Sequence, residues 1–265
     1  RSDVLRIARA ANLFAPGSIA VPQDNGKETF KLDKLAPANG FNHSNAHDAL
    51  SDVRATIHVA KLLRKDAPDV WTAMDDHSRK NVVMDFLGKN SMFTVSEMYY
   101  GKLYSWMVVP CGTHQSQMVV FDLAYDPDVF KGHSVEELID VMNSPNKAIR
   151  TFRSNAQPIL AAANLAPEST KALKISEAER TRRAQSILND SEFRNRICEA
   201  TKLRYADEPR SDHFEEQIYD GFANEDEPLM AKFHGMDWDA RCSALNQFKD
   251  ARIIEFAHRL AFLDY

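Results

Sequence analysis

The chain has 265 residues, of which 44% are hydrophobic, and its 33 basic and 38 acidic side chains give a formal net charge of −5. This composition excludes disordered, collagen-like and strongly basic chains, and the length suggests two or three domains. The longest nearly apolar run, residues 159–166, is too short for the roughly 20 residues that cross a bilayer, so we expect no membrane span. Three widely separated cysteines favour a reducing cytoplasm over a disulfide framework.

Residues 1–65 have a helical pattern that is interrupted by prolines and glycines. The chain does not begin with Met and has no signal-peptide pattern, so we expect it to start inside a domain. A helix near residue 50 carries four apolar side chains on one face, and this pattern predicts that the face packs against a core. The four are Leu50, Val53, Ile57 and Ala60. Asp48 is the expected N-cap, because its carboxylate can accept hydrogen bonds from the free amides of the first turn.

The pattern then changes to one typical of strands. Three short runs are rich in strand-forming residues and are separated by glycine and proline, as in antiparallel hairpins. These runs are residues 92–95, 105–109 and 117–121. Ser134 and Glu137 form a capping-box pattern that predicts a new helix. From residue 156 onward the pattern is helical, with another capping start at Ser176.

The densest polar cluster, residues 42–52, lies where a loop enters the helix that follows Asp48. Asp52 lies in the first turn of this helix, where the helix dipole favours a carboxylate, and a hard divalent cation prefers such oxygen ligands. His47 lies on the adjoining loop and can take a proton from an attacking water near neutral pH. The pair suits metal-assisted hydrolysis of a phosphodiester. It also fits a structural role in capping and solvation, because the His-x4-Asp spacing occurs three times in this sequence.

Three ordered stretches resemble bacterial exonuclease I, a family of the DnaQ-like 3′→5′ exonucleases. The first matches the last active-site motif, the second the SH3-like domain and the third the opening of the late helical part. The first comprises residues 30–35, 38–40 and 43–56, the second residues 104–106 and 118–123, and the third residues 217–222. The resemblance implies an α+β architecture in three parts. These are the end of an RNase H-like exonuclease domain (1–66), an SH3-like β module with flanking helices (67–155) and a truncated helical C-terminal domain (156–265).

The resemblance makes His47 the general base and Asp52 a carboxylate that helps to hold a catalytic Mg²⁺. The remaining acidic residues of the family's active site would precede Arg1. Two-metal hydrolysis needs several carboxylates around metals about 3.5 to 4 Å apart, which one Asp and one His do not supply. We therefore expect that this chain alone neither binds two Mg²⁺ tightly nor degrades DNA.

The resemblance also indicates where single-stranded DNA would bind. Lys31 replaces a basic residue that approaches the single strand, and Arg79 and Lys80 fall where the family places basic groups near the DNA. Trp106 offers a stacking surface for a base, which is worth roughly 1 to 3 kcal/mol where it occurs. A Trp in an alternating strand is also typical of a packed core.

The implied function of the parent protein is Mg²⁺-dependent, processive removal of nucleotides from the 3′ end of single-stranded DNA in repair and recombination. We expect a cytoplasmic monomer. The family also binds the acidic tail of single-stranded-DNA-binding protein, but Ala166 stands where the family pattern has an Arg, so Arg180, Arg182 and Arg183 would have to compensate. Two alternatives stay open. One is a non-catalytic nucleic-acid-binding module, and the other is a metal phosphohydrolase of the HD class, suggested by the dipeptide His47-Asp48.

Overall fold

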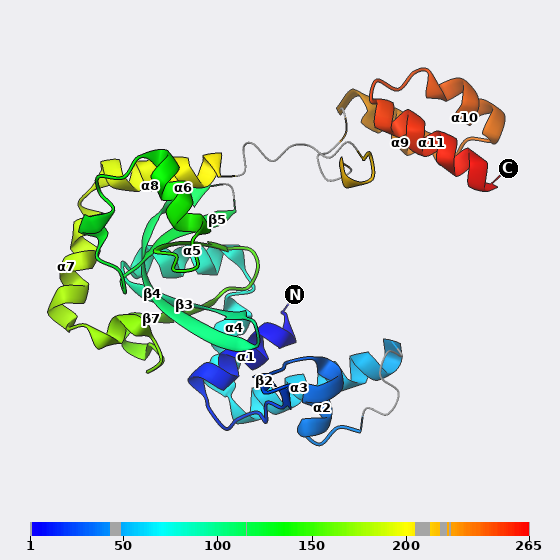
Figure 1. The fold of residues 1–265 in the computed structure, drawn as a ribbon. Helices are drawn as coiled ribbons and strands as arrows, with labels where there is room; N and C mark the ends of the chain where they lie inside the picture. The colour runs from blue at the N-terminus through cyan, green and yellow to red at the C-terminus, as the bar shows by residue number, and fades with distance from the viewer. Residues whose placement is uncertain are drawn as a thin grey trace. The chain divides into compact units, whose positions relative to one another are not determined.

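A computed structural model describes residues 2–42, 49–114, 116–204, 213–217, 222 and 224–264. The chain divides into two compact units, Arg1–Ala206 and Asp207–Tyr265, and each is described by itself (Figure 1). Within the described residues, no helix combines the length and the apolar character that a membrane crossing requires.

The first unit begins with helices and a short β-hairpin. In chain order these are α1 (Val4–Phe14), β1 (Gln23–Asp24), β2 (Lys27–Glu28), α2 (Leu32–Ala38), α3 (Ala49–Asp66), α4 (Pro68–Asp76) and α5 (Lys80–Lys89). Asp3 caps α1 by accepting a hydrogen bond of 2.9 Å from the backbone N–H of Leu5, and Pro68 begins α4 because its missing N–H would have no helical partner there. One hydrophobic cluster joins α1, α3 and α4 and includes Ile7, Val59 and Met74.

A five-stranded antiparallel sheet follows, with the strand order β6-β5-β4-β3-β7. The strands are β3 (Phe93–Tyr99), β4 (Lys102–His114), β5 (Gln117–Asp122), β6 (Ile149–Arg153) and β7 (Ile159–Ala162). The three predicted strand runs lie in β3, β4 and β5. The turn between β3 and β4 consists of Tyr100 and Gly101, both with positive φ (52° and 76°), as a two-residue hairpin turn requires. A side chain at position 101 would also lie 2.6 Å from Cβ of Lys27.

Helices cover both faces of this sheet. α6 (Val135–Asn143), α7 (Glu177–Leu188) and α8 (Ser191–Leu203) pack on one face through a cluster that includes Phe121, Leu138 and Phe193, while α5 packs on the other through Val83. The capping box predicted for α6 is confirmed, because Ser134 and Glu137 each accept a hydrogen bond from the other's backbone N–H. Ser176 caps α7 as predicted.

Two expectations about local structure are wrong. Residues 159–162 form β7 rather than a helix, because a short buried apolar run has the same pattern in either structure. The apolar face expected to anchor α3 is instead exposed: Leu50, Val53 and Ile57 are 56%, 54% and 47% exposed. The helix packs through a second face with the same period, formed by Ala55, Val59 and Leu63. The period of a helix does not tell which of two such faces meets the core.

The first unit extends past residue 156, where we expected the C-terminal domain to begin, since β7, α7 and α8 belong to it. The three-part division stays a prediction. The second unit contains α9 (Glu227–Phe233), α10 (Trp238–Leu245) and α11 (Ala251–Asp264). Asp226, only 2% exposed, accepts hydrogen bonds from the backbone N–H groups of Lys249 and Asp250, which fixes the approach to α11.

Candidate active site and nucleic-acid interface

Asp52 lies in the first turn of α3 and is partly exposed. The hydroxyl of Thr56, one turn further on, donates a hydrogen bond of 2.9 Å to the backbone carbonyl of Asp52. As an accessible carboxylate at a helix N-terminus, Asp52 fits as one oxygen ligand of a divalent cation. His47 and Asp48 lie outside the described residues, so the predicted pairing of His47 with Asp52 stays a prediction. The described part of the chain contains no group of three His, Cys, Asp or Glu side chains that would complete a metal site.

A cavity of about 790 Å³ lies between the start of α2 and the side of α3. Lys31, which precedes α2 and is exposed, lines this cavity together with Thr56 of α3. Ser78 also lines it, while Arg79 and Lys80, next along the chain, are exposed at the start of α5. Lys31, Arg79 and Lys80 thus lie on or beside one cavity. Thr56, which also lines this cavity, is one helical turn from Asp52.

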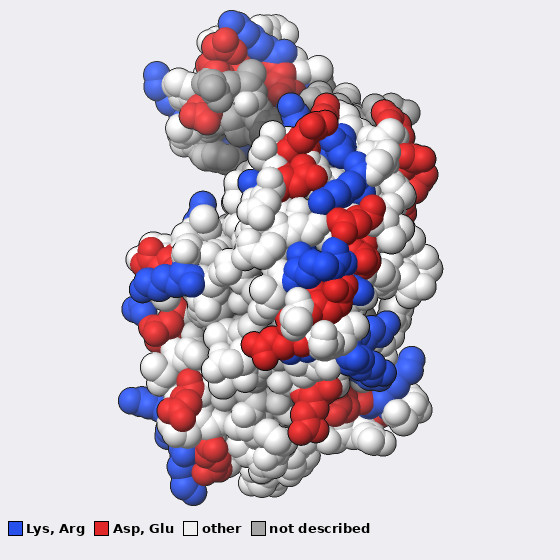
Figure 2. All heavy atoms as spheres, turned by 90° about the vertical axis from the view of Figure 1, so that its left-hand side faces the viewer, with Lys and Arg blue, Asp and Glu red and all other residues white. Residues whose placement is uncertain are grey.

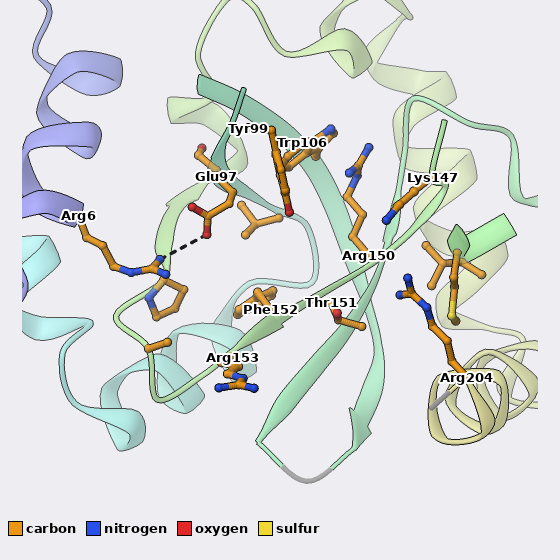
Figure 3. Close-up of a pocket in the computed structure, with 16 residues that line it drawn as sticks. Arg6, Glu97, Tyr99, Trp106, Lys147, Arg150, Thr151, Phe152, Arg153 and Arg204 are labelled. Carbon is orange, nitrogen blue, oxygen red and sulfur yellow. Dashed lines mark hydrogen bonds and ion pairs between the residues drawn. The ribbon is translucent and has the colours of Figure 1, made fainter. Parts of the chain in front are cut away.

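A second cavity, of about 250 Å³, lies on the sheet (Figure 3). Its lining combines aromatic and basic side chains: Tyr99 and Trp106 from the β3–β4 hairpin, Arg150 and Arg153 from β6, Lys147 before β6 and Arg204 after α8. Arg6 and Ala156 line both cavities. The two cavities therefore adjoin, and together they run from the side of α3 to the exposed aromatic side chains of the sheet.

Trp106 is partly buried among other side chains of the second cavity. The ring of Tyr104, two residues away on β4, is parallel to it within 9° at a centroid distance of 5.9 Å, and the ring of Tyr99 lies edge-on at 6.0 Å. The guanidinium carbon of Arg150 lies 3.9 Å from the Trp106 ring centroid, in a cation–π contact. Trp106 is therefore neither a fully buried core residue nor an uncovered stacking surface.

Positive charge predominates in the second cavity. Among the described residues that line it, the only acid is Glu97, which pairs with Arg6 at 3.5 Å and with Arg9 at 3.6 Å. Arg150 pairs at 3.5 Å with Asp122, which is 2% exposed. Burial lowers the pKa of Lys147, and repulsion by Arg204 and Arg150 lowers it further. Such crowding of cations is typical of a site that an anion completes.

Sequence reasoning missed Tyr99, Lys147, Arg150 and Arg204 as candidate binding residues. The available signal was the alternation of Tyr104 and Trp106 along one strand, which places both rings on the same face of the sheet. The guanidinium that lies on the Trp106 ring comes from Arg150 of β6, far away in the sequence. Only the sheet pairing brings them together.

Two arginines of α7 form ion pairs with acidic side chains of this chain. Arg182 pairs with Asp126, Asp128 and Glu179 at 2.6 to 2.8 Å, and Arg183 pairs with Glu179 at 2.8 Å. Figure 2 shows basic and acidic side chains interleaved over the side of the molecule that carries α7. Of the arginines that would have to replace the missing Arg at position 166, Arg182 and Arg183 are thus paired with acidic neighbours, while Arg180 donates to the backbone carbonyls of Ala172 and Ile175.

Comparisons with known proteins agree with these features. No family model matches the sequence. Exodeoxyribonuclease I of Escherichia coli K12 is 29% identical to this chain over 240 residues, which is 84% of this chain and 50% of that protein. The chain thus spans about half the length of the curated relatives that it matches.

Solved structures of exonuclease I share the fold. The enzyme from Methylocaldum szegediense has a TM-score of 0.76 at 27% identity, covering 98% of this chain and 57% of that one. E. coli exonuclease I in complex with a dA16 oligonucleotide has a TM-score of 0.74 at 25% identity, with coverages of 98% and 59%. The ExoI/SSB-Ct complex shares the fold alone, with a TM-score of 0.72 at 23% identity and coverages of 96% and 57%.

These similarities define the class of the chain, which is an α+β protein with the fold of a DNA exonuclease. Its particular relatives are the proteins named exodeoxyribonuclease I. The resemblance inferred from three sequence stretches is therefore confirmed, and so is the α+β fold class.

Proposed function

We propose that this chain is part of an Mg²⁺-dependent exonuclease that removes nucleotides processively from the 3′ end of single-stranded DNA during repair and recombination. The observation that carries the proposal is the agreement of sequence and fold with exonuclease I over nearly the whole chain, including a relative solved with an oligonucleotide. The adjoining cavities beside α3 supply a path for the strand. The parent protein is proposed to be a cytoplasmic monomer.

In this proposal His47 accepts a proton from the attacking water, and Asp52 is one of the carboxylates that hold the metal. A bound Mg²⁺ would stabilise the charge that develops on the phosphate. Lys31, Arg79 and Lys80 would neutralise phosphates of the strand, which raises affinity without selecting a sequence. Because the described residues offer Asp52 without a complete ligand set, we expect no hydrolysis by the isolated chain.

The fold is also shared with exonuclease I in its complex with SSB-Ct, and we propose the same acidic tail as a partner of the parent protein. The ion pairs of Arg182 and Arg183 argue against the α7 window as its binding site. A binding-only module is the second candidate function, because the cationic and aromatic cavity needs no metal to bind nucleic acid.

The experiment uses the longer protein that contains this chain. It is incubated with single-stranded DNA labelled at either end, with and without Mg²⁺, and nucleotide release is followed. We expect shortening from the 3′ end that needs Mg²⁺, and a decrease of about 100-fold or more for Asp52→Asn or His47→Ala. Asp33→Asn, which changes an exposed first-turn acid of α2, is the matched control. Unchanged release by Asp52→Asn would contradict the assignment, and DNA binding without any Mg²⁺-dependent release would favour the binding module.

A further inference from the structure

Lys147 follows α6 and lines the second cavity, where it is partly exposed. Figure 3 shows the ends of Lys147 and Arg204 turned toward Arg150. Burial lowers the pKa of Lys147, and the positive charges of Arg204 and Arg150 lower it further. Near neutral pH the unprotonated fraction of this amine is therefore larger than that of an ordinary lysine. An unprotonated amine has the lone pair that attacks an electrophile.

The acids near the second cavity are paired with arginines rather than with Lys147. Glu97, the only acid among the described residues that line the cavity, pairs with Arg6 at 3.5 Å. Asp122 pairs with Arg150, also at 3.5 Å. A carboxylate beside a lysine stabilises the ammonium form. Within the part of the chain that the structure describes, Lys147 has no such partner, so its amine stays available for reaction.

Two guanidinium groups of the second cavity are held in place by neighbouring side chains. Nε of Arg150 faces Asp122, and the guanidinium carbon lies 3.9 Å from the centroid of the Trp106 ring. Nε of Arg204 donates a hydrogen bond of 2.9 Å to Oδ1 of Asn143. A guanidinium that is already positioned binds a phosphate with little further loss of conformational freedom. The cavity therefore places a phosphate-binding group on either side of a reactive amine.

The second cavity has room for a small anion. Its volume of about 250 Å³ is below the roughly 300 to 1,000 Å³ of pockets that enclose drug-sized ligands. An acyl phosphate, such as acetyl phosphate, joins a phosphate to an electrophilic carbonyl in one small molecule. A phosphate bound by Arg150 and Arg204 would bring this carbonyl close to the amine of Lys147 and so favour the reaction over a chance encounter.

We propose that Lys147 is a site of acylation by acyl phosphates, and that Arg150 and Arg204 bind the phosphate of the reagent. The lone pair of Nζ attacks the carbonyl carbon and forms a C–N bond. The bond between this carbon and the phosphate oxygen breaks, inorganic phosphate leaves with the electron pair, and the amine releases its proton to solvent. The amide that results is neutral, so the cavity loses one positive charge. This inference goes beyond the proposed nuclease and does not depend on it.

The rate of acylation is measured with residues 1–265 and acetyl phosphate near neutral pH, and peptide mass spectrometry follows each lysine over time. Lys89, which is exposed on α5 and lies outside the cavity, is the internal control. We expect Lys147 to be acetylated about fivefold faster than Lys89 or more, because its amine is more often unprotonated and the reagent is bound beside it. Equal rates at the two lysines would overturn the inference.

Two measurements on the wild type test the binding of the phosphate. The N-hydroxysuccinimide ester of acetic acid transfers the same acetyl group but has no phosphate, so its preference for Lys147 over Lys89 should be weaker than that of acetyl phosphate. Added inorganic phosphate should slow the reaction of acetyl phosphate at Lys147 and leave Lys89 unaffected. An equal preference for Lys147 with both reagents, or equal inhibition at both lysines, would contradict the role given to the arginines.

A pair of variants tests Arg204 directly. Arg204→Gln should slow acetylation of Lys147 by acetyl phosphate about threefold or more, because a phosphate-binding group is lost and the amine is more often protonated. Arg64→Gln, at an exposed position in the last turn of α3, is the matched control and should react like the wild type. Circular dichroism checks that both variants fold. If Arg204→Gln does not fold, the competition by inorganic phosphate decides. Equal rates in two folded variants would contradict the proposed role of Arg204.

Discussion

The carboxylate of Asp122, at the end of β5, lies 3.5 Å from Nε of Arg150 on the neighbouring strand β6. The pair forms across the sheet, with 2% and 18% of the two side chains exposed. Burial raises the pKa of Asp122 and lowers the pKa of Arg150, in each case against the pull of the partner charge. Desolvation of the two charged groups therefore outweighs their mutual attraction. The main role of the pair is to position the guanidinium of Arg150 over Trp106.

Removing only the carboxylate of Asp122 should nevertheless destabilise the folded protein. Asp122→Ala leaves the half-buried Arg150 without its counter-charge and the backbone N–H of Ala124 without its acceptor, so the free energy of unfolding should fall by about 2 to 4 kcal/mol. Urea denaturation followed by circular dichroism measures this loss. Asp33→Ala, at an exposed position of α2, should have almost no effect, and equal stabilities of the two variants would contradict the role given to the buried pair.

The corrected orientation of α3 leads to opposite expectations for its two apolar faces. Leu63→Ala empties a fully buried position and should lower the free energy of unfolding by about 2 to 5 kcal/mol. Ile57→Gln changes a side chain that is 47% exposed and should stay within about 0.5 kcal/mol of the wild type. Urea unfolding of residues 1–265 compares the two variants. A larger decrease in the free energy of unfolding for Ile57→Gln than for Leu63→Ala would show that α3 packs through the face expected from the sequence.

Acid should weaken the attachment of α7. Hydrogen bonds from Arg182 and Arg183 lower the pKa of Glu179 to about 2, and hydrogen bonds from Ser186 and Arg182 lower the pKa of Asp128. In the unfolded chain such acids titrate near 4 to 4.5. Their contribution to stability is therefore present above that range and is lost as the pH falls toward 2. Unfolding measured across this window should show a shallower decline for Arg182→Gln, and an unchanged slope would exclude these pairs as the cause.

His77 should make stability depend on pH nearer neutrality. It is 6% exposed, burial lowers its pKa, and its Nδ1 has no hydrogen-bond partner in the described part of the chain. The folded protein therefore disfavours protonation of this imidazole, whereas the unfolded chain takes up a proton near pH 6.5. The free energy of unfolding should fall as the pH decreases below about 6.5. Thermal unfolding at a series of pH values should show a flatter profile for His77→Gln. A profile identical to that of the wild type would contradict the assignment.

Local signals predicted more of the fold than of the candidate site. The capping box of Ser134 and Glu137 lies within four consecutive residues, so its outcome depends little on the rest of the chain. The orientation of α3 and the strand formed by residues 159–162 depend on packing partners, which periodicity does not specify. Asp52 and Trp106 could be named because motifs of a known family carry them. Lys147 and Arg204 belong to no such motif and become neighbours of Arg150 only through tertiary packing.

Gln157 has a buried side chain that joins three parts of the first unit. Its amide nitrogen donates to the backbone carbonyl of Met74 on α4, and its amide oxygen accepts from the backbone N–H of Asp3 before α1. Glu97 adds a second tie from the sheet to α1 through Arg6 and Arg9. These links connect the helical layer to the sheet beside the wall that the two cavities share. A strand that occupied both cavities would therefore lie along one wall built from α1 and from the loop before β7.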